Sequence, residues 1–313
     1  MNDSRLIIWN RHAGAAERHH ALKRWLARRP RATIVETASF EEARDRAEAA
    51  SGHYRTLVAA GGDGTVNAVV NGLVAGRGGA RLGVLPLGSG NDLCRTLGVP
   101  LDPVEAAVVL DHGRATRIDL VEVRAAEERK WCVNAATGGN GSRIDECLTD
   151  ELKRRWGPLC YFRGALSVLP DLVEYDVSIR LDAHPPERFQ AANLILGNGR
   201  TVAGGLEVAP RANPEDGRIE VVVISGQSAF DVVALTARLL SGDYLDSEQV
   251  TYRQARRVEV ESDPPFAFSI DGNPLEGQPF VFETLPRALE VIVGPDYTPR
   301  PLPHGSSALR HSM

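Results

Sequence analysis

The chain has 313 residues, of which 43% are hydrophobic and 25% are charged. This balance is typical of a folded globular protein and excludes a disordered or fibrous chain. The net charge of -5 and the isoelectric point near 5.9 argue against nucleic acid as a partner, because phosphate backbones select basic surfaces. No segment approaches the roughly 20 apolar residues of a membrane span, so we expect no transmembrane segment.

The cysteines lie too far apart for a zinc site of the Cys-x-x-Cys kind: Cys94, Cys132, Cys147 and Cys160. Scattered thiols are typical of a reducing compartment, where structural disulfides are rare. The N-terminus also lacks the long apolar region and the cleavage site of a signal peptide. These features predict a cytoplasmic protein.

Basic residues dominate between residues 5 and 31, where Glu17 is the acid set against them. They are Arg5, Arg11, Arg18, Lys23, Arg24, Arg28, Arg29 and Arg31. Such a run is typical of the solvated face of a helix. It is also the pattern of a face that contacts anionic lipid, which would allow a transient association with a membrane surface.

Residues 1–120 alternate short apolar runs with helical patterns. Strands are predicted at 6–9, 32–36, 57–60 and 82–87. Helices are predicted around 22–26, where Pro30 ends the pattern, at 40–50, at 66–73 and from 91 onward. Strands that alternate with helices in this way indicate an α/β domain with a parallel sheet covered on both faces.

After about residue 120 the pattern is mainly strand-like and is broken by Gly, Pro, Asn and Asp. Strands are predicted at 118–123, 131–135, 177–181, 193–196, 219–224, 257–260, 266–270, 280–283 and 289–293, with helices at 148–172 and 229–240. This part predicts a mainly antiparallel β-sandwich. We therefore expect a nucleotide-binding domain over 1–120, a β-rich acceptor domain over 121–295 and a flexible tail over 296–313. The chain should be loose after Gly294, and a cleft should separate the domains.

Two strand–glycine–helix turns carry the strongest chemical signal. The first reads Gly61-Gly62-Asp63-Gly64-Thr65, and the second reads Gly88-Ser89-Gly90-Asn91-Asp92. Glycine lets the backbone approach a phosphate, and the helix that follows points its free N–H groups and positive dipole end at the same place. Because parallel strands bring both turns to one edge of the sheet, we expect the amides of 62–65 and 88–91 to converge on one anion.

Each turn also carries an acid, Asp63 in the first and Asp92 in the second. We expect these carboxylates to lie close together beside polyphosphate, which requires that a cation such as Mg²⁺ shares the site. Arg95, one turn into the second helix, is placed to meet a transferring phosphoryl group. The alternative for either acid is a plain N-cap, and glycine after a strand is often only a turn.

Several other nucleotide and catalytic motifs are absent. The lysines are Lys23, Lys130 and Lys153, and none follows a glycine as a P-loop requires. The dinucleotide fingerprint fails because Asn67 stands where its third glycine belongs. Ser89 is not a hydrolase nucleophile elbow, since Leu87 replaces the first glycine of that motif.

The segments over 61–67 and 85–98 closely resemble the diacylglycerol kinase catalytic family. They read Gly-Gly-Asp-Gly-Thr-Val-Asn and Leu-Pro-Leu-Gly-Ser-Gly-Asn-Asp-Leu-Cys-Arg-Thr-Leu-Gly. The family includes bacterial soluble diacylglycerol kinases, YegS-like lipid kinases, and sphingosine and ceramide kinases. Further similarity at 153–161, 193–217 and Asp271-Gly272 extends the resemblance over nearly the whole chain. The first motif alone is shared with NAD kinases.

The resemblance implies an NAD-kinase-like fold and a kinase that transfers phosphate from ATP, with Mg²⁺, to a hydroxyl of diacylglycerol or a related lipid. The implied nucleotide contacts are Asn10, Gly14, Thr37, Gly61, Gly62, Asp63, Gly64, Thr65, Asn67, Gly88, Ser89, Gly90 and Asn91. The implied catalytic positions are Asp63, Asp92, Arg95, Asp119, Asp271 and Asn273. A structural metal is implied at Asn213, Asp216 and Arg218, the first and last through backbone carbonyls. The choice of lipid and the formation of a homodimer are left open.

Departures from the family pattern bear on activity. The turn over 10–14 lacks the family's Pro and Ser, and Ala68 replaces a usual glutamate. Asn273 stands where the family has the glutamate that takes the proton from the lipid hydroxyl, and an amide is not a base near neutral pH. Asp271 or Glu276 would substitute only if the loop brings one of them to the hydroxyl.

Three hypotheses follow from the sequence. The first is an active ATP-dependent kinase for a lipid hydroxyl, which the two glycine turns and their acids support. The second is a protein that binds nucleotide or lipid and turns over little, which Asn273 and Ala68 motivate. The third is a kinase for a small soluble acceptor, as NAD kinases are.

Overall fold

The computed structural model describes residues 4–14, 19–140, 172–226, 235, 238–239 and 242–299. Arg18, Cys147, Cys160 and the similarity over 153–161 lie outside this part of the chain, as does nearly all of the predicted helix over 148–172. Of the predicted helix over 229–240, residues 235, 238 and 239 are described, and they are helical. No helix in the described ranges has the length and apolar character needed to span a membrane.

The N-terminal half is built on four parallel strands in the order β2-β1-β3-β4. They are β1 (Arg5–Asn10), β2 (Ala32–Thr37), β3 (Thr56–Gly61) and β4 (Arg81–Pro86). The run Leu57–Ala60 is wholly buried, as expected for a strand covered on both faces. This confirms the predicted parallel α/β architecture.

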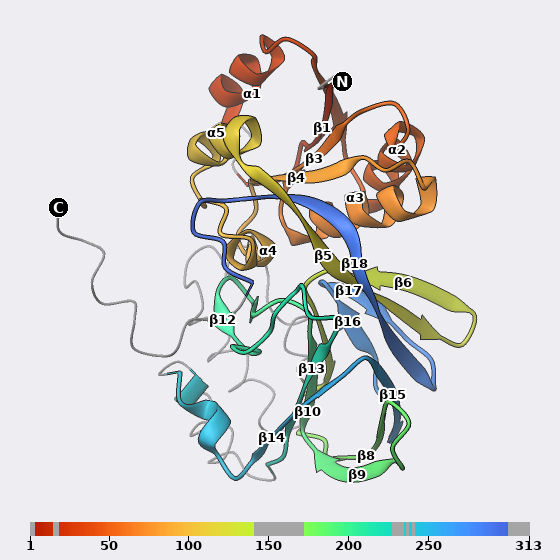
Figure 1. Cartoon of the computed structure of the whole chain (residues 1–313). Helices are drawn as coiled ribbons and strands as arrows, with labels where there is room; N and C mark the ends of the chain where they lie inside the picture. The colour runs from red at the N-terminus through yellow and green to blue at the C-terminus, as the bar shows by residue number, and fades with distance from the viewer. Residues whose placement is uncertain are drawn as a thin grey trace, which may run out of the picture.

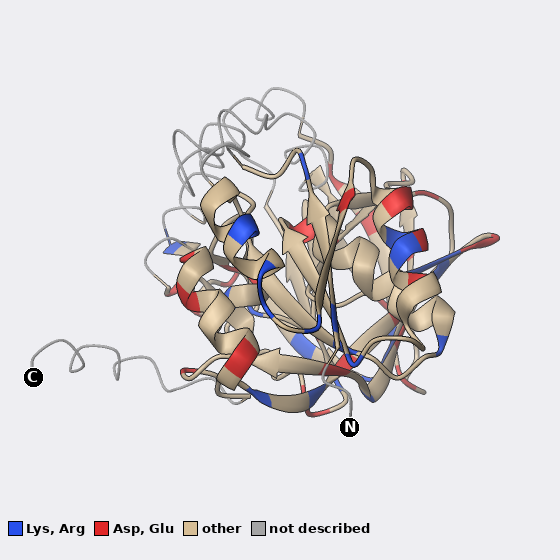
Figure 2. Cartoon of the chain, turned by 90° about the horizontal axis from the view of Figure 1, so that it is seen from above, with Lys and Arg blue, Asp and Glu red and all other residues tan. Residues whose placement is uncertain are grey.

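Helices cover both faces of these strands. They are α1 (His20–Ala27), α2 (Phe40–Ala50), α3 (Asp63–Gly76), α4 (Asp92–Thr96) and α5 (Pro103–His112). Figure 1 shows α1 and α5 on one side of the strands and α2 and α3 on the other. Charged residues lie mainly on the helices and at the rim, and the strands in the middle are largely free of them (Figure 2).

The C-terminal half is a mainly antiparallel sandwich, as predicted. One layer is a six-stranded sheet in the order β14-β13-β10-β7-β16-β17, and the other is the far part of the large sheet. The six strands are β7 (Ala135–Gly139), β10 (Asn193–Gly197), β13 (Ile219–Ile224), β14 (Val250–Ala255), β16 (Phe268–Ile270) and β17 (Asn273–Leu275). The core between the layers includes Phe268, which packs edge-on against Phe280 and Phe282 at 4.8 and 4.9 Å between ring centroids.

Two long strands join the halves into one ten-stranded sheet. They are β5 (Arg114–Ala125) and β18 (Phe280–Val293), and the remaining strands beside them are β6 (Glu128–Cys132), β8 (Tyr175–Leu181), β9 (Glu187–Ala191) and β15 (Arg257–Asp263). β18 pairs antiparallel with β5 and, at its end, parallel with β4. Strands had been predicted separately at 280–283 and 289–293. The structure has one strand with a bulge between Leu285 and Leu289.

The end of the described chain packs on the N-terminal core. Residues Val291, Ile292 and Val293 belong to that core, and so does Tyr297, which is buried. The Tyr297 hydroxyl donates to Glu215 at 2.8 Å. The prediction that the chain is loose after Gly294 is therefore wrong for 295–299, and the domain bounds at 120 and 295 stay a prediction.

Asp119 fixes the bulge of β18 from its place on β5. The residue is fully buried, and its carboxylate accepts hydrogen bonds from the N–H groups of Arg287 at 2.7 Å and Gly217 at 2.6 Å. Burial raises the pKa of Asp119, and these two hydrogen bonds oppose the rise. Asp119 is not among the residues that line the pocket described below, and its predicted catalytic role stays a prediction.

Asp119→Asn is expected to lower the free energy of unfolding by about 2 kcal/mol, because the amide turns an NH₂ group toward a buried N–H donor. Chemical denaturation measures the loss, and kinase activity should fall only as far as the folded fraction does. An unchanged unfolding curve together with lost activity would instead support a catalytic role for Asp119.

Candidate active site

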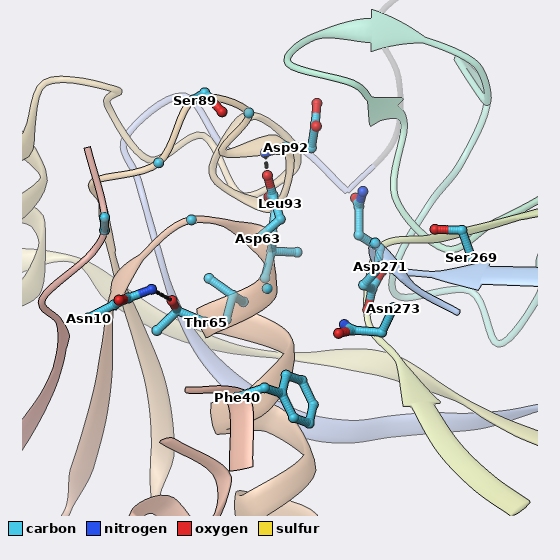
Figure 3. A pocket seen from close by; sticks show the side chains of 18 of the residues that line it. Asn10, Phe40, Asp63, Thr65, Ser89, Asp92, Leu93, Ser269, Asp271 and Asn273 are labelled. Atoms are coloured by element: carbon cyan, nitrogen blue, oxygen red, sulfur yellow. Dashed lines mark hydrogen bonds between the residues drawn. The ribbon is translucent and has the colours of Figure 1, made fainter. Parts of the chain in front are cut away.

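The glycine turns after β3 and β4 touch through their backbones. A Cβ built on Gly88 would lie 2.3 Å from the Cα of Gly62, so a side chain at this position would force the turns apart. The N–H of Leu87 donates to the carbonyl of Gly61 at 2.9 Å, which continues the pairing of the two strands into the turns. Both turns line one pocket of about 780 Å³, to which both halves of the chain contribute (Figure 3).

The carboxylate of Asp63 holds the second turn in place. Its two oxygens accept hydrogen bonds from the N–H groups of Asn91 and Asp92, each at 2.8 Å. Asp92 begins α4, whose N-cap residue Asn91 makes no capping bond of its own. Asp63 therefore supplies the capping carboxylate from the neighbouring turn, where the positive end of a helix favours a negative charge.

The carboxylate of Asp92 links the second turn to the C-terminal half. Its oxygens accept hydrogen bonds from the N–H groups of Gly204 and Gly205, each at 2.8 Å. These glycines connect β11 (Thr201–Val202) to β12 (Leu206–Glu207). Asp63 and Asp92 are neighbours, as predicted, but two backbone N–H groups stabilise each carboxylate. These donors offset part of the hydration that the two carboxylates lose, and a cation shared between them stays a prediction.

Burial raises the pKa of Asp63 to about 6, and the negative charge of Asp92 adds to the rise. Asp271 contributes in the same direction, while the N–H groups of Asp92 and Asn91 lower the value. The carboxyl group thus titrates close to neutral pH. Such a value in a pocket is typical of functional sites.

The structure leaves fewer backbone N–H groups for the predicted anion than the sequence suggests. Gly62 is the N-cap of α3 and has no capping side chain. The N–H of Thr65 donates to the Gly62 carbonyl at 2.9 Å, whereas the N–H groups of Asp63 and Gly64 lie too near the start of the helix to have acceptors within it. In the second turn, the N–H of Gly88 donates to the side chain of Asn91, and the N–H of Asn91 donates to Asp63. The prediction that these two amides face the anion is wrong, because both are used within the fold. The two residues between them, Ser89 and Gly90, line the pocket.

One wall of the pocket combines the ends of β1 and β2 with the start of α2. The Asn10 side chain donates to the Thr65 hydroxyl at 3.0 Å, which ties β1 to the first turn of α3 (Figure 3). Gly14 has φ 60°, and a Cβ there would lie 2.7 Å from a backbone carbonyl oxygen after β4. Thr37 and Phe40 complete this wall. The structure thus places the predicted residues Asn10, Gly14 and Thr37 together.

Phe40 also lines this wall and is not among the residues predicted from the sequence. A signal was present, because Ser39 and Glu42 have the spacing of a capping box. Ser39 caps the helix by accepting the N–H of Glu42 at 3.1 Å, and Glu42 accepts the N–H of Ala38, one residue before the cap, at 2.9 Å. That motif places Phe40 in the first helical turn beside the pocket. Thr137 and Ser269, which line the opposite wall, belong to strands of the sandwich and carry no local motif.

The opposite wall is organised by Asp271. Asp271 and Gly272, with φ values of 46° and 86°, form the two-residue hairpin turn between β16 and β17. The Asp271 carboxylate accepts the N–H groups of residues 133, 134 and 135 at 2.8 to 3.0 Å and the Asn67 side chain at 2.8 Å. Burial raises the pKa of Asp271, and these donors oppose the rise.

Asn67 and Asn273 form an amide network behind the pocket. Asn67 also donates to the carbonyl of Trp131 at 2.8 Å, and its oxygen accepts the Asn273 side chain at 3.3 Å. Asn67 is buried, does not line the pocket and joins α3 to the sandwich, while its predicted nucleotide contact stays a prediction. Asn273 does line the pocket.

Arg95 is not among the residues that line the pocket, and its predicted contact with a transferring phosphoryl group stays a prediction. Its guanidinium is exposed and donates to the carbonyl of Gly204 at 3.0 Å. None of the described residues that line the pocket is a lysine or an arginine. An anion in the described lining would therefore meet backbone N–H groups and hydroxyls rather than a cationic side chain.

The predicted metal residues form a separate turn that does not line the pocket. The N–H of Arg218 donates to the Asp216 carboxylate at 3.0 Å, and the N–H of Asp216 donates to the Asn213 carbonyl at 3.3 Å. Burial raises the pKa of Asp216. The described residues contain no cluster of three or more His, Cys, Asp or Glu side chains that could hold a metal. Asp216 would be the one carboxylate of this predicted set, and the metal site stays a prediction.

Comparison with known proteins identifies the class. Residues 4–123 match the family Diacylglycerol kinase catalytic domain, and residues 135–293 match the YegS C-terminal NAD kinase beta sandwich-like domain. Two Bacillus anthracis crystal structures superpose with TM-scores of 0.81 and 0.72, at 22% and 21% identity, over 95% of this chain and 97% and 98% of theirs. The second is a diacylglycerol kinase. These structures share the fold, and the match to the catalytic-domain family identifies the class as a kinase.

Relatives narrow the class further. A Pseudomonas aeruginosa protein named Probable lipid kinase YegS-like is 35% identical over 265 residues, which cover 84% of this chain and 82% of that protein. The diacylglycerol kinase of Bacillus subtilis is 30% identical over 249 residues, which cover 79% of this chain and 80% of the relative. The chain belongs to the family of YegS-like lipid kinases and diacylglycerol kinases.

The raised pKa of Asp63 predicts a pH-dependent stability. The folded chain holds the proton to about pH 6, whereas the unfolded carboxyl releases it near 3.8. Relative to Asp63→Asn, the free energy of unfolding of the wild type should therefore fall by about 2.4 kcal/mol as pH rises from 4 to 7. Urea denaturation of both proteins across this range measures the difference. A difference that stays constant with pH would contradict the raised value.

Proposed function

We propose that the chain transfers the γ-phosphoryl group of ATP to a hydroxyl of diacylglycerol or a related lipid. The observation that carries the proposal is that two glycine turns and the uncapped start of α3 share one pocket with the Asp271 wall. The glycine turns and the start of α3 provide backbone N–H groups for phosphate. The side of the pocket next to the Asp271 wall offers room for an acceptor, and the names of the relatives point to a lipid.

The two walls suggest how the substrates would lie. The wall of Asn10, Thr37 and Phe40 would hold the nucleoside, with the phosphates at the start of α3. ATP enters as its magnesium complex, in which the cation offsets phosphate charge that no lysine or arginine of the described lining can offset. The acceptor hydroxyl would then lie between the glycine turns and the wall of Asp271 and Ser269.

An exposed apolar surface supports association with a membrane. The large exposed hydrophobic side chains of the described ranges are Trp25, Leu101, Val104 and Val108. Trp25 lies on α1 and the other three on or just before α5, and the ion pair of Arg29 with Asp111, at 3.1 Å, joins these helices. The guanidinium of Arg29 also stacks on the Trp25 ring at 4.0 Å. A tryptophan and aliphatic residues beside basic side chains favour an anionic lipid surface.

Asn273 favours a second candidate, a homologue that binds its ligands and turns over slowly. Its amide has no basic lone pair for the acceptor proton. Loss of a general base costs about 10²–10⁴-fold in rate, so binding would persist while turnover fell.

Labelled phosphate transfer from ATP to lipid separates the two candidates. The wild type is expected to label diacylglycerol in mixed micelles, and Asn273→Glu is expected to change the rate by less than about 10-fold, because positioning and charge stabilisation dominate phosphoryl transfer. A gain above about 100-fold would favour the weakened homologue instead. No labelled product from any lipid would contradict the proposed function.

Sedimentation with anionic vesicles tests the exposed surface. Val104→Asp combined with Val108→Asp should reduce the bound fraction several-fold, because the charges oppose insertion next to anionic headgroups. Ala49→Asp, at an exposed position of α2, is the matched control and should bind as the wild type does. Equal binding by all three proteins would exclude this surface as the contact.

A further inference from the structure

Two hydroxyl side chains lie side by side on the wall of the pocket that Asp271 organises. Thr137 of β7 and Ser269 of β16 are paired residues of neighbouring antiparallel strands, and both line the pocket. Figure 3 shows Ser269 on the same wall as Asp271. Directly paired residues of two strands bring their Cβ atoms to about 5 Å of each other, so one ligand can contact both hydroxyls.

The strand pattern turns these hydroxyls away from the core of the sandwich. Side chains alternate between the two faces of a strand. Phe268 and Ile270, on either side of Ser269, belong to the core between the layers, and so does Ala136, which precedes Thr137. The pair therefore lies on the outer face of the six-stranded sheet, which forms the pocket wall at this place.

The fold does not use either hydroxyl. Within the described part of the chain, neither the Thr137 hydroxyl nor the Ser269 hydroxyl makes a hydrogen bond to another residue, although Ser269 is only 8% exposed. The neighbouring polar side chains of this wall do have partners: Asp271 accepts four donors, and Asn273 donates to Asn67. Because buried polar groups are normally hydrogen-bonded, a hydroxyl that faces a pocket without a partner is available to a ligand.

The charges of the lining favour a neutral acceptor. The acidic side chains of the described lining are Asp63, Asp92 and Asp271, and none of its residues is a lysine or an arginine. An acceptor that carried its own phosphate or carboxylate would meet like charges there, which disfavours binding. The hydroxyls of Thr137 and Ser269 can instead donate to the carbonyl oxygens of a neutral acceptor.

Apolar side chains border the hydroxyl pair. On its other side, Thr137 is paired with Ile195 of β10, which belongs to a separate apolar cluster together with Val222 and Tyr244. Val202 packs against this cluster and also lines the pocket. Hydroxyl donors next to apolar surface fit a ligand in which carbonyl groups adjoin acyl chains.

We propose that the hydroxyls of Thr137 and Ser269 donate hydrogen bonds to the ester carbonyl oxygens of the acceptor lipid and thereby select a glycerol diester. The assignment rests on the proposed kinase function. Diacylglycerol carries two ester carbonyls beside the hydroxyl that receives the phosphoryl group, and these match two neighbouring donors. The hydrogen bonds hold the acceptor against the Asp271 wall, and the pair determines specificity without taking part in proton transfer.

The test compares two acceptors that differ only in these carbonyls. They are dioctanoylglycerol and its diether analogue dioctylglycerol, each presented with MgATP in the same mixed micelles. The kcat/KM of the wild type should be at least about 10-fold higher for the diester, because the diether leaves both hydroxyls without acceptors. Thr137→Val combined with Ser269→Ala should bring this ratio to within about 2-fold of one, with the KM for MgATP changed less than about 2-fold.

The matched control removes the same two hydroxyl groups elsewhere. It combines Thr33→Val, at an exposed position of β2, with Ser178→Ala on β8, and neither residue lines the pocket. The control should keep the wild-type ratio. A variant that is only less stable loses activity toward both acceptors equally, so the ratio separates a direct contact from a structural effect.

Each result decides the assignment. A wild type that uses both acceptors equally well, or a double variant that keeps the wild-type preference, would overturn it. A KM for MgATP that rises as much as the KM for the acceptor would also overturn it, by placing the pair at the nucleotide. If the double variant does not fold, each single variant should lower the ratio at least about 2-fold, and unchanged ratios in both would overturn the assignment. An inactive wild type refutes the proposed function, whereas an active wild type without the preference refutes only this assignment.

Discussion

The architecture of the pocket depends on two hydrogen bonds, which the N–H groups of Asn91 and Asp92 donate to the carboxylate of Asp63. They fix the second glycine turn against the first, at a contact between Gly62 and Gly88 that has no room for a side chain. Burial of the carboxylate costs stability, as its raised pKa indicates. The destabilising carboxylate lies where phosphate would bind, and a rigid backbone is most useful at that place.

Buried carboxylates also join the two halves of the chain. Asp92 connects the second turn to Gly204 and Gly205, Asp119 joins β5 to the bulge of β18, and Asp271 gathers three backbone N–H groups and Asn67 of α3. Each carboxylate replaces its lost hydration with N–H donors, which is how a buried charge remains tolerable. The positions of the nucleotide wall and the acceptor wall are thereby coupled through polar contacts rather than through the hydrophobic cores alone.

The sequence predicts the parts of the site that depend on local chemistry, whereas contacts with distant partners are visible only in the structure. Apolar runs such as Leu57–Ala60 and the paired glycine turns define strands and turns by themselves. Asp119 and Arg95 carry the residue types of catalysis, but their partners, Arg287 and Gly204, lie far along the chain. For the same reason, the break in the pattern before Leu289 read as a loop, whereas a bulge held by Asp119 keeps β18 continuous.

Calorimetry with MgATP, comparing the wild type with Gly88→Ala, tests the central claim most directly. The account predicts that the wild type binds and that the variant, whose Cβ would meet Gly62, keeps its secondary structure but loses at least about 10-fold in affinity because the turns are forced apart. Equal affinities, or a wild type that releases no heat on binding, would contradict it.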